Sequence, residues 1–159
     1  MTSATFQSIY EAHAPDVRRL ALCITRSPDA AAEITSETFL RAWTGRLSIR
    51  TETAKAYLLA IARNLAIDHL RRPAQLVPIE DHHAVALSAG TASIELQQAF
   101  EAISHLPGAY RDALLLAVVE GLSYEETARV LGVSLACAKV RVHRARLMLV
   151  ESISKKEIP

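Results

Sequence analysis

The stretch SYEETARVLGVSLACAKVRVHRAR, residues 123–146, decides the fold of the C-terminal half of this 159-residue chain. Ser123 and Glu126 have the spacing of a capping box, which predicts the start of a helix. Gly132 can take the left-handed conformation that ends this helix, and Ser134 can cap the next one. The second helix is basic along its first half. Two helices joined by a short turn that contains glycine predict a DNA-binding helix-turn-helix.

Apolar residues recur every three or four positions in the second helix and form one stripe: Leu135, Ala138, Val142, Ala145 and Leu149. We expect this stripe to pack against the first helix. The opposite side presents Ala136, Lys139, Val140, His143 and Arg144. Lys139 and Arg144 can bind a phosphate or a guanine edge, and the small apolar residues can approach a thymine methyl group. The alternative interpretation is an ordinary solvated basic helix in a bundle.

The composition indicates an all-α protein of the cytoplasm. Half of the residues are hydrophobic, only 5% are aromatic, and no strand-like alternation is sustained. The net charge of +1 is unevenly distributed, because residues 55–72 and 134–159 are basic and the residues between them are acidic. Two basic regions suit two separate contacts with a polyanion. The N-terminus does not resemble a signal peptide, and no apolar run is long enough to span a membrane.

The sequence contains no group of residues that would support catalysis or metal binding. Cys23 and Cys137 are the only cysteines, so neither a disulfide framework nor a zinc site is indicated. No phosphate-binding glycine motif and no nucleophile with a neighbouring base occur. We therefore expect no cofactor, no metal and no enzymatic activity.

The chain is expected to contain two small helical domains, residues 1–72 and 93–159, joined by a flexible linker at residues 73–92. The linker holds two prolines and a glycine without a helical period. The predicted helices before the helix-turn-helix cover residues 5–26, 30–43, 53–72, 93–105 and 108–120. The helix at 30–43 is expected to turn Ile34, Phe39, Leu40 and Trp43 inward. Its outward positions are expected to be Glu33, Glu37, Thr38 and Arg41.

Several segments together resemble the compact extracytoplasmic-function (ECF) type of bacterial RNA polymerase sigma factor, which keeps sigma regions 2 and 4. AAEITSETFLRAW (Ala31–Trp43) resembles region 2.2, and AYLLAIARNLAIDHLRR (Ala56–Arg72) is similar to region 2.4. ISHLPGAYRDALLLAVVEGLSYEETARVLGVS (Ile103–Ser134) resembles the start of region 4, and AKVRVHRAR (Ala138–Arg146) its recognition helix. The resemblance covers nearly everything outside the linker and the last few residues.

The resemblance implies three functional surfaces. Core RNA polymerase would be bound through Glu33, Glu37, Thr38 and Arg41. The promoter −10 element would be opened and read through Arg46, Arg50, Lys55, Arg63, Asn64, Arg71 and Arg72. The −35 element would be read as duplex DNA through Ala136, Lys139, Val140, Arg141, His143, Arg144 and Arg146. The −10 segment has few rings for base stacking, since only Trp43 and Tyr57 lie nearby and both can be core residues.

Two positions of the recognition helix depart from the family pattern. Val140 replaces a residue that is usually small and polar, so we expect a methyl contact in place of a hydrogen bond to DNA. Cys137 replaces a threonine near the helix start, which predicts a weaker cap or phosphate contact. The result would be a shifted −35 preference with function retained.

The resemblance implies core RNA polymerase, promoter DNA and an anti-sigma factor as partners. Two other interpretations stay open. A helix-turn-helix regulator would bind operators without core polymerase, usually as a dimer, although residues 31–72 argue against it. A sigma mimic would sequester an anti-sigma factor without binding a promoter, but such mimics tend to lose the basic residues that this recognition helix keeps.

Overall fold

A computed structural model describes residues 3–73 and 93–157 of the chain. The described residues form helices, turns and bends with no strand, which confirms the all-α class. The chain divides into two compact units, Met1–Gln97 and Gln98–Pro159. The predicted linker lies outside the described residues except for Pro73.

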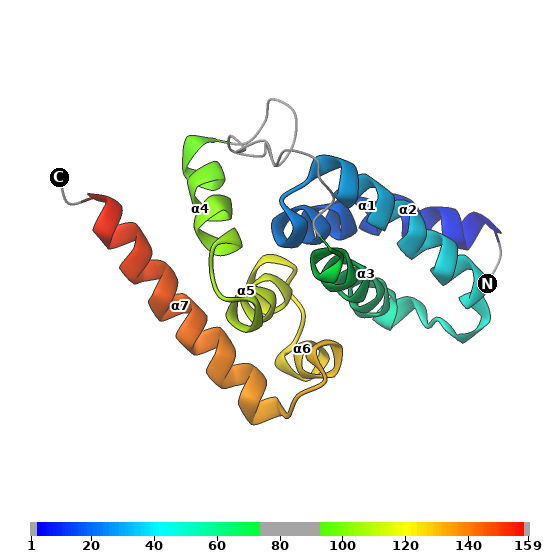
Figure 1. Ribbon diagram of the computed structural model, residues 1–159. Helices are drawn as coiled ribbons and strands as arrows, with labels where there is room; N and C mark the ends of the chain where they lie inside the picture. Colours follow the sequence, from blue (N-terminus) through cyan, green and yellow to red (C-terminus); the bar gives the residue numbers. More distant parts are fainter. Residues whose placement is uncertain (1–2, 74–92, 158–159) are drawn as a thin grey trace. The chain divides into compact units, whose positions relative to one another are not determined.

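The N-terminal unit is built from three helices that each pack against the other two. They are α1 (Ser3–Thr25), α2 (Pro28–Thr44) and α3 (Ala54–Arg71), coloured from blue to green in Figure 1. Two short 3₁₀ turns, η1 (Arg46–Ser48) and η2 (Thr51–Thr53), form the connection between α2 and α3. The three helices predicted for this half are therefore confirmed.

Local sequence explains where the first two helices meet. The Ser27 hydroxyl accepts a hydrogen bond from the Ala30 amide at 3.1 Å, and Pro28 occupies the first turn of α2. A proline fits this position because its amide would lack a helical partner there anyway. Pro15 lies inside α1, which is continuous from Ser3 to Thr25.

The core of the N-terminal unit combines large residues with many alanines. Leu20, Leu58 and Leu59 are at most 1% exposed, and the smaller side chains allow the three helices to approach closely. The prediction that Leu40 turns inward is wrong, because its side chain is 60% exposed. Leu40 follows Glu37 by three positions and Glu33 by seven, which places it on their solvent-facing side of α2.

The C-terminal unit contains most of α4 (Ile94–Ser104), whose first residues precede Gln98, and all of α5 (Gly108–Leu114), α6 (Tyr124–Leu131) and α7 (Leu135–Glu157). A five-residue π-helical turn, η3 (Leu115–Val119), extends α5, where the sequence predicted one uniform helix. The Glu120 amide donates to the Leu115 carbonyl at 2.8 Å, which is the i→i−5 bond of a π-turn. Both α5 and α6 pack against α7 (Figure 1).

The turn of the helix-turn-helix forms as the sequence predicts. Ser123 and Glu126 make both hydrogen bonds of a capping box, at 3.0 and 3.1 Å. Gly132 has φ 69° and ψ 35°. The Val133 amide donates to the Ala128 carbonyl at 3.0 Å, and the Gly132 amide donates to Arg129, which completes a Schellman motif. The end of α6 is therefore fixed by backbone hydrogen bonds around one left-handed glycine.

The stripe predicted for the second helix of this motif is confirmed at its centre. Ala138, Val142 and Ala145 are fully buried, and Leu149 is partly buried. Leu135 was predicted to be buried with them but is 38% exposed, because it is the first residue of α7. The packed stripe thereby fixes which side of α7 faces solvent.

Replacing Gly132 with alanine should destabilise the C-terminal unit by about 1–2 kcal/mol, since a Cβ is unfavourable at positive φ. A urea titration followed by circular dichroism should show this loss. Fluorescence of Trp43, the only tryptophan, reports the unfolding of the N-terminal unit. The transition that it follows should be the same in the variant as in the wild type. Gly108→Ala is the control, because a Cβ there meets only ordinary contacts, 3.5 Å or more away. Equal effects of the two substitutions would contradict the proposed role of the turn.

Candidate nucleic-acid interface

The exposed side of α7 carries the residues that the sequence placed there. The exposed members are Ala136, Lys139, Val140, His143, Arg144 and Arg146, and Arg141 is partly buried. They alternate with the buried stripe, so packing of one side orients the other toward solvent. The structure therefore brings together all seven residues predicted to read duplex DNA on one helix.

The arginines of α7 are available for an external anion. Among the residues that the structure describes, no acidic side chain forms an ion pair with Arg141, Arg144 or Arg146. The Lys139 ammonium lies 5.9 Å from the centre of the Tyr124 ring, at the outer limit of a cation–π contact. Unpaired arginines on an exposed helix suit phosphate and guanine contacts.

A shallow pocket adjoins this side of α7. Its volume is about 390 Å³, and its lining residues are Ala109, Tyr110, Ala136, Cys137, Val140, Arg141 and Arg144. Tyr110 comes from α5, and sequence reasoning did not include it because only tertiary packing places that helix beside α7. The pocket combines apolar groups with a cationic edge, which suits a thymine methyl group next to a phosphate.

Ser134 provides the cap at the start of α7. Its hydroxyl accepts a hydrogen bond from the Cys137 amide at 3.1 Å. The backbone cap therefore does not depend on the side chain at position 137, which is a partly buried free thiol. Cys23, the second free thiol, is buried within α1.

The seven residues predicted for the −10 element do not share one surface. Arg50, Asn64, Arg71 and Arg72 are exposed, whereas Arg46, Lys55 and Arg63 are partly buried. Lys55 lies on the same side of α3 as buried Ala62 and Ala66, and its ammonium is 3.6 Å from Asp16 of α1. Lys55 therefore links α1 to α3 inside the unit.

A different side of α3 carries polar groups, of which Asn64 and Arg71 are exposed and Tyr57 is partly buried. Tyr57, Asn64 and Arg71 follow one another at intervals of seven residues, or about two helical turns, so they share a face. Arg46 belongs to the connection that precedes this helix. Its guanidinium carbon is 3.9 Å from the centre of the Trp43 ring, and it donates a hydrogen bond to the Trp43 carbonyl at 2.9 Å.

The surface predicted to bind polymerase needs one correction. Glu33 and Arg41 are exposed, and Arg41 pairs with Glu37 at 3.0 Å. Thr38 is fully buried, and its hydroxyl donates to the Ile34 carbonyl at 2.7 Å. Helical periodicity explains this result, because Thr38 lies four positions from buried Ile34 and Ala42.

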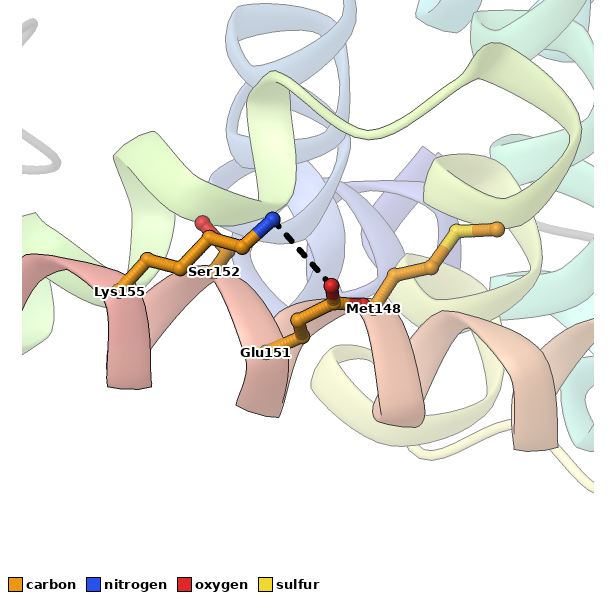
Figure 2. A pocket seen from close by; sticks show the side chains of 4 residues that line it. All are labelled: Met148, Glu151, Ser152 and Lys155. Carbon is orange, nitrogen blue, oxygen red and sulfur yellow. Dashed lines mark ion pairs between the residues drawn. The ribbon is translucent and has the colours of Figure 1, made fainter.

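A second shallow pocket lies along the C-terminal part of α7 and offers little chemistry. Figure 2 shows the four lining side chains, Met148, Glu151, Ser152 and Lys155, which all come from this one helix. Lys155 pairs with Glu151 at 3.2 Å. No helix among the described residues is long and apolar enough to cross a membrane.

Two helical units, one with a helix-turn-helix whose basic side is exposed, define a DNA-binding protein of the transcription machinery. Family models match in the same order: Sigma-70 region 2 over residues 9–75 and Sigma-70 region 4 over residues 96–149. The chain belongs to the ECF sigma factor family, which confirms the resemblance found in the sequence. Members of this family are not enzymes.

Similar proteins cover most of the chain. The ECF RNA polymerase sigma factor SigM of Bacillus subtilis is 30% identical over 91% of this chain and 93% of its own length. The ECF sigma factor SigE of Mycolicibacterium smegmatis is 31% identical over 95% of this chain, which spans 62% of that protein. The sigma factor RpoE of Bartonella quintana, solved in complex with the anti-sigma factor NepR, has a TM-score of 0.80 and 27% identity over 94% of this chain and 97% of its own.

Thymine-to-uracil substitution in the −35 element should weaken binding about fourfold at the position that we predict Val140 to contact, because one methyl contact would be lost. Val140→Ser should remove this discrimination. Val118→Ser is the matched control, because Val118 is 46% exposed and Val140 is 45% exposed, but Val118 lies in η3. Competition binding with uracil-substituted duplexes measures the effect. Discrimination that survives Val140→Ser would contradict the methyl contact.

Lys55→Met should lower the unfolding free energy of the N-terminal unit by about 0.5–1 kcal/mol, since it removes the pair with Asp16. Arg71→Ala should leave stability unchanged. It should instead reduce by about one the slope of DNA affinity against salt concentration. Urea titration, monitored by Trp43 fluorescence, measures the change in stability. DNA binding at several salt concentrations measures the change in the salt slope. If Lys55→Met lowered the salt slope and Arg71→Ala lowered the stability, Lys55 would be the phosphate contact.

Proposed function

We propose that this chain binds core RNA polymerase and directs it to specific promoters. The C-terminal unit reads the −35 element, and the N-terminal unit reads and opens the −10 element. The observation that carries this proposal is the exposed basic side of α7, whose arginines form no ion pair with the described acidic residues, in a chain that also matches Sigma-70 region 2 over residues 9–75. Because one chain holds both units, a single protein contacts two separate promoter elements.

The polymerase contact is assigned to the outer side of α2. Glu33, Glu37 and Arg41 supply polar groups there, and Leu40 places an exposed apolar side chain beside them. An exposed apolar residue next to polar ones is a common arrangement in protein–protein interfaces. This set shares no residue with the Tyr57–Asn64–Arg71 side of α3, so polymerase and promoter would use different side chains.

An anti-sigma factor is the proposed regulator of this chain. The Bartonella quintana sigma factor to which it is similar was solved with an anti-sigma factor bound. Such a partner would keep the sigma factor inactive by covering surfaces that polymerase and DNA use. The cytoplasm is the proposed place of action, since core polymerase works there.

The two other interpretations are less favoured but remain testable. A regulator that acts without polymerase would have no use for the polar outer side of α2 and the whole region 2 unit. A sigma mimic would have no use for Lys139 and Arg144, which are exposed on α7. The regulator thus leaves the N-terminal unit unexplained, and the mimic leaves the basic side of α7 unexplained.

A reconstituted transcription assay tests the proposal with purified protein, core polymerase and promoters from its own genomic neighbourhood. We expect promoter-specific transcripts that fall at least tenfold with Arg144→Ala and with Lys139→Ala. Each substitution removes a charge-assisted contact worth about 1–3 kcal/mol. Core binding, measured by native gel shift, should persist in both variants and weaken with Leu40→Lys.

The controls distinguish the alternatives. Lys155→Ala removes a cation from the far end of α7, where it pairs with Glu151, and should leave transcription unchanged. A wild-type chain that fails to bind core polymerase would contradict the sigma assignment. DNA binding by the chain alone would then favour the regulator, and binding only to an anti-sigma factor would favour the mimic.

A further inference from the structure

The pocket beside α7 takes one large side chain from outside the helix-turn-helix. Tyr110, in α5, lines this pocket together with Arg141 and Arg144 of α7. Tyr110 is partly buried, whereas Ala109 before it is exposed. Because α5 packs against α7 (Figure 1), this tyrosine lies next to the side of α7 that is predicted to face DNA. The surface available to DNA is therefore wider than the recognition helix itself.

Among the polar side chains of α5, that of Tyr110 is the one available to a ligand. Arg111 donates a hydrogen bond to Asp112 at 2.9 Å, and these two side chains are only 11% and 2% exposed. Their charges are therefore used inside the C-terminal unit. Within the described part of the chain, the Tyr110 hydroxyl forms no hydrogen bond. It can donate to a group outside the unit.

Arg141 brings a cation to the same pocket. It follows Cys137 by four positions, about one helical turn, so both residues lie on the side of α7 that lines the pocket. No acidic side chain of the described residues pairs with Arg141. A neutral hydroxyl donor and an unpaired guanidinium in one shallow depression suit a phosphate, whose oxygens accept hydrogen bonds from both kinds of group.

The position of Tyr110 favours the DNA backbone over a base edge. The major groove is about 12 Å wide and admits one helix. With α7 in the groove, a side chain from the neighbouring α5 reaches the edge of the groove, where the phosphates lie. Gly108 and Ala109, at the start of α5, are small and exposed, so they leave room for the backbone to approach.

We propose that Tyr110 donates a hydrogen bond to one phosphate at the edge of the −35 element, and that Arg141 neutralises the same phosphate. The inference rests on the proposed reading of the −35 element by α7. Contacts to phosphates fix the register and orientation of a protein on its duplex, while contacts to base edges supply specificity. Tyr110 thus helps to set where α7 enters the groove, although it lies outside the helix-turn-helix.

Binding of the holoenzyme to a duplex promoter tests this contact, with one phosphate at a time replaced by a neutral methylphosphonate. Tyr110→Phe should weaken binding about tenfold, because it removes one hydrogen bond to a charged group. In the wild type, replacement of one particular phosphate should also weaken binding. At that phosphate the two losses should not add, because they remove the same contact. At every other phosphate the two losses should add.

The salt dependence of binding gives a second readout, which a merely structural role of Tyr110 would not explain. Because the hydroxyl is neutral, Tyr110→Phe should leave the slope of affinity against salt concentration unchanged. Arg141→Ala should reduce this slope by about one. It should also fail to add to the methylphosphonate effect at the phosphate that Tyr110→Phe identifies.

A matched control makes the same chemical change in the N-terminal unit. Tyr10 is 43% exposed and packs against Phe39, and Tyr10→Phe should change neither the affinity nor the salt slope. Tyr110→Phe keeps the aromatic ring, so circular dichroism should show the helix content and the urea midpoint of the wild type. These measurements separate a lost contact from a disturbed fold.

Several results would overturn the inference. Equal affinities of Tyr110→Phe and wild type would show that the hydroxyl makes no contact. A loss that adds to the methylphosphonate effect at every phosphate would assign Tyr110 to the packing of α7. Non-additivity with a thymine-to-uracil replacement would place Tyr110 against a base. Failure of the proposed function is distinct, because the wild-type holoenzyme would then bind the promoter no better than an unrelated duplex.

Discussion

The close packing of α7 through very small side chains is the constraint on which the DNA-facing surface depends. Ala138, Val142 and Ala145 are fully buried, and their size lets the backbone of α7 approach α5 and α6. A helix can bury only one stripe in this way, so the intervening basic residues must face solvent. A larger side chain at Ala138 would shift the helix and displace Val140 and Arg144. Recognition therefore depends on residues that never touch DNA.

The N-terminal unit divides its charged groups between stability and binding along a single helix. The side of α3 that carries Ala62 and Ala66 is buried, and Lys55 continues this side toward Asp16 of α1. The side that carries Asn64 remains exposed and can contact an external ligand. Net charge alone would count all the cations of this helix as DNA contacts. The packing shows that one of them holds two helices together.

Most of the fold was predictable because its signals are local. The capping box at Ser123 and the left-handed Gly132 need only neighbouring residues, and both form as predicted. The errors arose at positions where tertiary packing decides whether a side chain is buried or exposed. Thr38 satisfies its hydroxyl with a backbone carbonyl and is buried, while Leu40 is exposed despite its apolar side chain. Tyr110 was missed because only the packing of α5 brings it to the pocket beside α7.

Hydroxyl-radical footprinting of the holoenzyme on a promoter that it transcribes tests the two-unit account most directly. The account predicts two separate protected tracts that appear only with core polymerase. Arg144→Ala should weaken the upstream tract alone, and Arg71→Ala the downstream tract alone. One continuous or palindromic tract, protected by the chain without polymerase, would contradict the account.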